Sequence, residues 1–359
     1  MTTSGQLVPV FDGHNDMVLD MYGWDGPRRR RSFFERGESG HLDLPRMREG
    51  GFAGGIFAVF VPSDPTYARP ELRPAAEGEE SGERPLASPI GTEYALRCAM
   101  ALTSTLMRIE DESKGEFTLV RDAADIRSCM AEGRIAAVLH FEGAEAIDPG
   151  LNALEVLYRA GLRSLGLVWS RPNVFAEGVP FAFPSSPDTG PGLTRAGKDL
   201  VRECNRMGVM VDLSHLNERG FWDVAEISTR PLVASHSNAH AVTPVTRNLL
   251  DKQLEAIRDS GGIAGLNYAV QFARPDGRHD PETPLADLVR HVDYMVERMG
   301  IDHVGLGSDF DGCTVPAELG DATGLPRLIE ALRAAGYSEV DLRKIASDNW
   351  LRVLETTWA

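Results

Sequence analysis

The chain has 359 residues, of which 42% are hydrophobic and 25% charged, so it can bury a large core and is not a disordered protein. Its formal net charge of −16 at pH 7 argues against nucleic acid or an anionic membrane as its main partner. No apolar run reaches the length of a membrane span, and residues 1–6 lack the features of a signal peptide. We therefore expect a cytoplasmic protein.

Eight short apolar, β-rich segments recur along the chain and predict parallel strands buried on both faces. They are Leu7–Phe11, Ile56–Val61, Ile135–His140, Ser164–Trp169, Val209–Leu213, Pro231–Ala234, Ile263–Asn267 and His303–Gly307. Segments with helical spacing lie between and after them: Thr92–Ile109, Leu154–Ala160, Thr194–Met207, Asp251–Asp259, Leu285–Met299, Leu325–Ala335 and Glu339–Glu355. This alternation favours a single (β/α)₈ TIM barrel over residues 1–359, with an open doubly wound sheet as the alternative.

Three segments rich in Gly, Pro, Ser and charge interrupt the alternation, and we expect them to be loop insertions: Gly23–Gly40, Ser63–Pro89 and Arg171–Gly192. Long loops within a compact domain are often functional lids. The first contains four consecutive arginines, residues 28–31, the local exception to the acidic balance. They indicate either a solvated loop or subunit contact, or an attraction for anionic substrates.

The first strand is followed directly by Asp12-Gly13-His14-Asn15-Asp16. In extended backbone, residues i and i+2 point to the same side, so His14 and Asp16 can aim an imidazole and a carboxylate at one point. Nitrogen and oxygen ligands of this kind suit zinc. The pair predicts one edge of a metal site.

Similar polar motifs follow four later strands, at the end of a barrel where active sites lie. They are His140-Phe141-Glu142-Gly143, Asp212-Leu213-Ser214-His215, Ser235-His236-Ser237-Asn238 and Gly307-Ser308-Asp309-Phe310-Asp311-Gly312. One such histidine is commonly structural, and one such acid, for example Asp311, is commonly a helix N-cap. Five motifs at one rim are harder to explain structurally. His215 and His236 are 21 residues apart, so neighbouring strands can present them together.

The set has the size of a two-metal centre, in which each ion needs roughly three or four ligands, including solvent. His14, Asp16, His215 and His236 supply four ligands, and Glu142 can bridge the two ions. Two close cations can share a hydroxide and lower its pKa to near neutrality. Asp309 then stays free as a proton carrier.

Together with Arg247-Asn248, these motifs resemble the membrane (renal) dipeptidase family of zinc peptidases, in the family's order and over nearly the whole chain. The resemblance implies a barrel of the amidohydrolase, metallo-dependent hydrolase type, two zinc ions per chain, dipeptide substrates and a homodimer. It also implies that His14 and Asp16 bind one zinc ion, that Glu142 bridges both ions, and that His215 and His236 bind the second.

For the substrate, the resemblance implies that Arg247 contacts the dipeptide's C-terminal carboxylate, a role that suits a planar bidentate donor. It makes Asp309 the acid/base residue and places Tyr268 in the pocket lining.

Trp169 is a departure from the family pattern, because many members have a histidine there that polarises the scissile carbonyl. Tryptophan donates one hydrogen bond and carries no proton charge. Either zinc and other donors stabilise the oxyanion, or Trp169 faces a different substrate shape. A second departure is Gly54-Gly55-Ile56-Phe57, where relatives often have Gly-Gly-Gln-Phe.

The leading hypothesis is hydrolysis of L-Xaa-L/D-Xaa dipeptides by a metal-bridging hydroxide, with Asp309 passing the proton to the leaving amine. The alternative is another binuclear amidohydrolase reaction, on N-acyl amino acids, cyclic amides or β-lactams. A third reading is a non-catalytic binding protein, which the joint presence of five ligands and Asp309 disfavours. Iron, cobalt or manganese can also enter such a site.

Overall fold

The computed structural model describes residues 7–22, 31–63 and 85–359. Eight strands pair in parallel in the order β1, β2, β4, β5, β6, β7, β8 and β9, while β3 pairs only with β4 outside this path. The strands are β1 Val10–Asn15, β2 Phe52–Phe60, β3 Phe117–Leu119, β4 Ile135–Glu142, β5 Leu162–Gly166, β6 Met210–Asp212, β7 Val233–Ala234, β8 Ile263–Leu266 and β9 Val304–Leu306.

The sheet curls so that its first strand meets the segment after its last strand. Asn15 forms a parallel bridge with Phe310, and the Asp16 amide donates to the Phe310 carbonyl at 2.8 Å. The buried carboxylate of Asp12 accepts hydrogen bonds from the amide and hydroxyl of Ser308, at 2.7 and 2.8 Å. These bonds make a nearly closed eight-stranded barrel, so the predicted (β/α)₈ TIM barrel is confirmed and the alternative of an open sheet is wrong.

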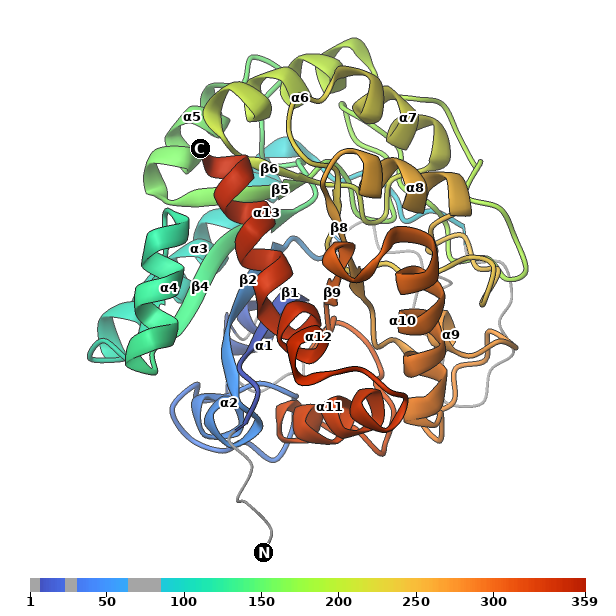
Figure 1. The fold of residues 1–359 in the computed structure, drawn as a ribbon. Helices are drawn as coiled ribbons and strands as arrows, with labels where there is room; N and C mark the ends of the chain where they lie inside the picture. Colours follow the sequence, from blue (N-terminus) through green and yellow to red (C-terminus); the bar gives the residue numbers. More distant parts are fainter. Residues whose placement is uncertain (1–6, 23–30, 64–84) are drawn as a thin grey trace, which may run out of the picture.

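Helices surround the strands (Figure 1). They are α1 Met17–Tyr22, α2 Leu44–Gly50, α3 Thr92–Glu112, α4 Ala123–Glu132, α5 Asn152–Ala160, α6 Arg195–Met207, α7 Glu218–Ile227, α8 Asp251–Asp259, α9 Val270–Ala273, α10 Leu285–Met299, α11 Leu325–Ala334, α12 Glu339–Arg343 and α13 Asn349–Trp358. Short 3₁₀ helices span Ile301–His303 and Ala322–Gly324, and a π-helical turn, Lys344–Asp348, joins α12 to α13.

Local chemistry explains where these helices begin and end. Helix α6 begins after Thr194, whose hydroxyl accepts from the Gly197 amide, and ends at Gly208 with φ 71°. Helix α4, which the sequence analysis did not predict, has the same signals: Asp122 accepts from the Asp125 amide, and Gly133 ends the helix at φ 70°. The two cap residues of α4 therefore indicate this helix more clearly than the spacing of its apolar residues does.

Helix α13, which carries Trp350, crosses one end of the barrel in Figure 1. Trp350 is fully buried and donates its indole N–H to the Leu306 carbonyl at 2.9 Å. A Cβ at Gly13 would overlap this indole ring, so β1 needs a glycine there to admit it. Because this end is filled by Trp350 and its apolar neighbours, a site can form only at the opposite end, where the strands finish.

Several predicted boundaries were wrong at the strand ends. Strand β1 begins at Val10 rather than Leu7 and continues to Asn15, so His14 lies within the strand and not after it. Strand β5 ends at Gly166, which leaves Trp169 in the following loop. The expected helix Glu339–Glu355 is a continuous helical run in three pieces. Strand β3 and the helices α2 and α7 were not predicted.

The third predicted insertion, residues 171–192, packs against the carboxyl end of the barrel. Its Val179 amide donates to the His215 carbonyl at 2.8 Å, and its Ala182 carbonyl accepts from the Thr246 amide at 3.1 Å. The other two insertions, including the arginine run, lie partly outside the described residues. No helix among the described residues has the length and apolar character to cross a bilayer.

A pH effect on stability follows from His291, which lies buried on α10. Its Nδ1 accepts from the Ala239 amide at 3.2 Å, so the proton sits on Nε2, which donates to the Ala273 carbonyl at 3.1 Å. Burial lowers its pKa from 6.5 to about 4. The neutral ring therefore stabilises the fold above pH 6.5, and this contribution is lost as the pH falls toward 4.

We expect the wild type to lose about 2 kcal/mol more unfolding free energy than His291→Gln between pH 7.5 and pH 5. Urea unfolding of both proteins at the two pH values measures the difference. The other titrating groups are shared, so equal losses in the two proteins would show that His291 does not titrate as proposed.

Candidate metal centre and active site

Five side chains predicted as metal ligands meet at the carboxyl end of the barrel. His14 Nε2 lies 3.4 Å from Asp16 Oδ2 and 3.8 Å from Glu142 Oε2. His215 Nε2 and His236 Nε2 lie 3.0 and 3.7 Å from Glu142 Oε1. Glu142 thus presents one oxygen to His14 and the other to the two later histidines, as a bridging carboxylate would.

Hydrogen bonds behind His236 fix which of its nitrogens faces the centre. The Asp212 carboxylate can only accept, so the Ser235 hydroxyl donates to it. The Ser235 oxygen then accepts from His236 Nδ1–H, 2.7 Å away. This leaves an unprotonated Nε2 directed at Glu142 and at His215 Nε2, 3.1 Å away. On His215, Nδ1 contacts the Ser170 hydroxyl at 2.9 Å, so its Nε2 also faces the centre.

Unsatisfied polar atoms at the centre support a cation there. Both ring nitrogens of His14 and Oδ1 of Asp16 are buried and have no hydrogen-bond partner among the described residues. Such atoms are costly to bury unless something pairs with them. Three groups of three side chains have donor atoms within 4.8 Å of one another. Two of them share no residue and could each hold one ion: Glu142, His215 and His236, and His14, Asp16 and Asp309. The third, His14, Asp212 and His236, overlaps both. The donor set therefore fits two divalent metals.

Electrostatics point the same way. Burial alone lowers the pKa of His14, but the surrounding carboxylates of Glu142, Asp16 and Asp309 outweigh it and raise the pKa to about 10. Burial, reinforced by Asp16, raises the pKa of Glu142 well above its ordinary value. Burial also holds the pKa values of His215 and His236 well below theirs. The two later histidines are thus neutral, the form that binds metals, and the raised pKa of His14 reflects the excess of carboxylates around it, which a bound cation would balance.

Asp309 is held in place by its neighbours at the rim. Its backbone is left-handed, with φ 60°, and its amide donates to the His14 carbonyl at 3.0 Å. Its Oδ2 accepts from the Asn267 side-chain amide at 2.9 Å. Burial, with the nearby charge of Asp16, raises its pKa to about 6, near the value that suits proton transfer at neutral pH.

Gly312 leaves space that a larger residue would take. A Cβ at this position would overlap Oδ2 of Asp16 and Oδ1 of Asp309. The gap between these two carboxylates therefore depends on the absence of a side chain.

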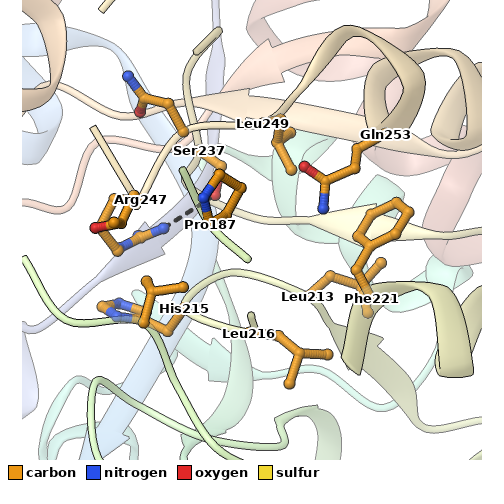
Figure 2. Close-up of a pocket in the computed structure, with 12 residues that line it drawn as sticks. Pro187, Leu213, His215, Leu216, Phe221, Ser237, Arg247, Leu249 and Gln253 are labelled. Carbon is orange, nitrogen blue, oxygen red and sulfur yellow. Dashed lines mark hydrogen bonds between the residues drawn. The ribbon is translucent and has the colours of Figure 1, made fainter. Parts of the chain in front are cut away.

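Arg247 is buried beside the centre, and only some of its N–H donors have hydrogen-bond partners among the described residues. It donates to the His236 carbonyl at 2.9 Å and to the Ser237 hydroxyl at 3.2 Å, which Figure 2 shows as a dashed line. Guanidinium has five N–H donors, so three remain, including an Nε without a partner among the described residues. A cavity of about 10 Å³ next to it, lined also by Leu213 and Phe221, holds no more than about one water molecule.

Trp169 and Tyr268, the other two predicted substrate contacts, lie on different sides of the centre. The half-buried indole of Trp169 lies 6.0 Å from the His215 ring, between ring centroids. Tyr268 is fully buried with its ring edge-on to Phe310 at 5.6 Å, and its hydroxyl has no partner among the described residues. Burial raises its pKa well above the ordinary value, so it stays a neutral donor.

The interpretation of Asp311 as a helix N-cap was wrong. No helix begins after it; its buried carboxylate instead accepts from Arg31 and from the His41 amide, each at 2.5 Å. Asp311 has left-handed backbone with φ 67°, close to the φ of 60° at Asp309. Its bonds hold the segment around residue 41 against the loop that carries Asp309.

Sequence reasoning missed the residues that orient the proposed ligands. Asp212 and Ser235 set the tautomer of His236, and Asn267 holds Asp309. Asp212 and Ser235 stood in the predicted rim motifs without a role, and Asn267 was the last residue of a predicted strand, so its position at a strand end could have marked it. Ser170, which contacts His215 from a loop, gave no such signal.

Comparison with known proteins gives matches over the whole barrel. The family model described as membrane dipeptidase (peptidase family M19) matches residues 5–358. A metallo peptidase from Rhodobacter sphaeroides, liganded with a phosphinate mimic of L-Ala-D-Ala, is 51% identical with a TM-score of 0.93, covering 98% of this chain and all of that one. The dipeptidase verJ of Clonostachys rogersoniana is 30% identical over 354 residues, 97% of this chain and 84% of its own. An amidohydrolase from Pseudomonas aeruginosa, 21% identical with a TM-score of 0.75, covers 98% and 97% and shares the fold.

We expect Gly312→Ala to reduce bound metal to fewer than two ions per chain, because its methyl group would separate or displace Asp16 and Asp309. Metal content by mass spectrometry of the purified protein measures this. Gly91→Ala is the matched control, since a Cβ there meets no atom within 4 Å. Two retained metals in Gly312→Ala would mean that the space between the carboxylates is not needed.

Proposed function

Since the chain belongs to the membrane dipeptidase family, peptidase family M19, and is a metallo-dipeptidase of that family, we propose that its rim hydrolyses L-Xaa-L/D-Xaa dipeptides with two zinc ions. The observation that carries this proposal is Glu142, whose two oxygens face His14 on one side and His215 and His236 on the other. The ligand of the Rhodobacter relative, a mimic of L-Ala-D-Ala, supports a C-terminal D-residue among the substrates.

In this proposal His14 and Asp16 hold one ion, His215 and His236 hold the other, and Glu142 bridges them. When bound, the ions supply a Lewis acid for the scissile carbonyl and a water of lowered pKa. The hydroxyls of Ser235 and Ser170 keep the histidine rings in position behind the ligands. Trp169 cannot act as a charged donor to the scissile carbonyl, because an indole donates one hydrogen bond and carries no proton charge.

Asp309 is the proton carrier of the proposed reaction. It lies beside His14 and Asp16, and because the Asn267 amide binds Oδ2, Oδ1 is the oxygen that accepts a proton from the attacking water in this proposal. The same oxygen then gives that proton to the amine nitrogen as the peptide bond breaks. Because one carboxylate does both steps, it needs a pKa between those of an ordinary carboxyl and the amine, which burial provides.

Arg247 limits the substrate to short peptides in this proposal. Its three remaining N–H donors suit the free C-terminal carboxylate, which accepts bidentate hydrogen bonds. The cavity next to it toward Leu213 is too small for a dipeptide, so the substrate approaches Arg247 from another side in this proposal. A longer peptide would place a neutral amide at this buried cation.

Purified protein loaded with zinc should hydrolyse a panel of L-Xaa-L-Ala and L-Xaa-D-Ala dipeptides, followed by amine release. N-acetyl amino acids are the second set of substrates. They test the second candidate function, an amidohydrolase that needs no free amine, which Trp169 in place of histidine favours. Turnover of N-acetyl amino acids alone would replace the dipeptidase assignment.

The homodimer and the cytoplasmic location stay predictions, as does a single domain over residues 1–359.

We expect Asp309→Asn to keep both metals but to lower kcat by about 10²- to 10⁴-fold, since an amide neither accepts nor donates the transferred proton. Steady-state kinetics and metal analysis on the same preparation measure both effects. Asp302→Asn, a carboxylate more than half exposed on the surface, serves as the control. A fully active Asp309→Asn would assign the proton transfer to another group.

We expect Arg247→Met to raise KM for dipeptides by about 10- to 100-fold, the effect of losing hydrogen bonds to a charged group. Methionine keeps an apolar stem against Phe272 and removes the charge. The dipeptide amide, which has no carboxylate, should respond far less to the substitution. Arg278→Met, on a side chain 74% exposed, is the matched control. An unchanged KM in Arg247→Met would remove Arg247 from substrate binding.

A further inference from the structure

We propose that Trp169, supported from behind by Arg171 and flanked by Phe60, receives the side chain of the dipeptide's N-terminal residue and selects apolar side chains there. The inference rests on the proposed dipeptidase function and adds a substrate preference to it. It starts from four aromatic rings that form one continuous wall beside the metal centre.

Each ring of the wall contacts the next. The Phe60 and Trp169 ring centroids lie 5.1 Å apart, those of Trp169 and Phe181 6.0 Å, and those of Phe181 and Phe272 5.8 Å. Phe60 ends strand β2, Trp169 follows β5, Phe181 belongs to the insertion at residues 171–192, and Phe272 lies on α9. Three of these rings, all but Phe272, are only half-buried, so they have surface to offer a ligand.

The wall runs past the centre from the carboxylate-binding end to a distal end. Phe272 packs under the Arg247 guanidinium, at 5.5 Å. In the middle, Trp169 and Phe181 both contact the ring of His215, at 6.0 and 6.3 Å between centroids. Phe60 lies beyond Trp169, at the end away from Arg247.

The chemistry of a dipeptide sets its direction along this wall. Its carboxylate belongs at Arg247 and its scissile carbonyl at the group of Glu142, His215 and His236. The residue before the scissile bond must then continue past His215, which brings its side chain to Trp169 and Phe60. The C-terminal side chain lies at the other end, toward Phe272.

Arg171 fixes the position of the Trp169 indole. Its guanidinium carbon lies 4.9 Å from the Trp169 ring and 5.4 Å from the Phe60 ring, distances at which a cation binds an aromatic face. Arg171 is 1% exposed and donates to the Val61 carbonyl at 2.8 Å. Its Nε lies 3.6 Å from Glu145, an ion pair that keeps the charge in place. Arg171 is therefore a positioning residue for the wall.

The same short segment also connects the wall to the centre. Between Trp169 and Arg171, the Ser170 hydroxyl contacts Nδ1 of His215 at 2.9 Å. Three consecutive residues thus supply an apolar surface, a bond to a proposed metal ligand, and a buried anchor. A shift of this segment would move the substrate surface and His215 together.

Apolar rings backed by a cation favour uncharged side chains. A leucine or phenylalanine side chain would bury apolar surface against Trp169 and Phe60. A lysine side chain would lose hydration there, and Glu145, the described carboxylate next to the wall, already pairs with Arg171. We therefore expect a preference for Leu-Ala and Phe-Ala over Gly-Ala and Lys-Ala.

The test compares kcat/KM for Gly-Ala, Leu-Ala, Lys-Ala, Ala-Gly and Ala-Leu in the zinc-loaded wild type, Trp169→Ala, Trp169→Phe and Arg171→Met. Trp169→Ala should lower the ratio of Leu-Ala to Gly-Ala by about tenfold or more, within the range that hydrophobic pockets provide. Trp169→Phe should restore most of that ratio. Arg171→Met should lower it by a smaller factor and raise the ratio of Lys-Ala to Leu-Ala. The ratio of Ala-Leu to Ala-Gly should stay within twofold in every variant.

An unchanged Leu-Ala to Gly-Ala ratio in Trp169→Ala would overturn the proposal, and so would a change confined to Ala-Leu, which would place Trp169 at the C-terminal residue. A wild type that cleaves dipeptides well without an N-terminal preference would defeat only this inference. A wild type that cleaves none of them would defeat the proposed function itself. If Arg171→Met does not fold, the two Trp169 variants still decide the proposal.

Discussion

The seam between the first strand and the segment after the last strand is the constraint on which the site depends. Asp12 binds the amide and hydroxyl of Ser308, and the backbones of His14 and Asp309 share a hydrogen bond at 3.0 Å. These contacts join residues almost 300 positions apart and place the proposed proton carrier beside the first proposed metal ligands. Without closure of the barrel, His14 and Asp309 would lie at opposite edges of an open sheet.

The rim of the barrel also carries energetically costly features. His215, Asp309 and Asp311 all have left-handed backbone, which L-residues adopt at a cost of about 1–3 kcal/mol each. Buried carboxylates crowd the same space, and their pKa values rise as a result. Such costs are tolerated where the surrounding structure enforces them, and divalent cations would remove the electrostatic part. The strain and the charge thus have one explanation in a metal-dependent hydrolase.

The insertion at residues 171–192 shows how a loop can become part of a rigid site. Its backbone bonds to His215 and Thr246 fix Phe181 in the aromatic wall, and Arg171 at its start is buried under Trp169. The proposed metal ligands therefore lie at or near strand ends, whereas most of the proposed substrate wall comes from the segments that follow the strands.

The sequence by itself determined the barrel and the rim, because buried parallel strands leave long apolar runs and their polar ends stand out against them. It identified His14, Asp16, Glu142, His215, His236 and Asp309 as one group, which the tertiary structure brings together; their roles as ligands and proton carrier remain proposals. Only the tertiary structure decided what surrounds that group. The tautomer of His236 depends on Asp212 and Ser235, the reach of Asp309 on Asn267 and Gly312, and the wall on Arg171. These contacts join separate strands and loops, and no local pattern of residues records which distant side chain a loop will meet.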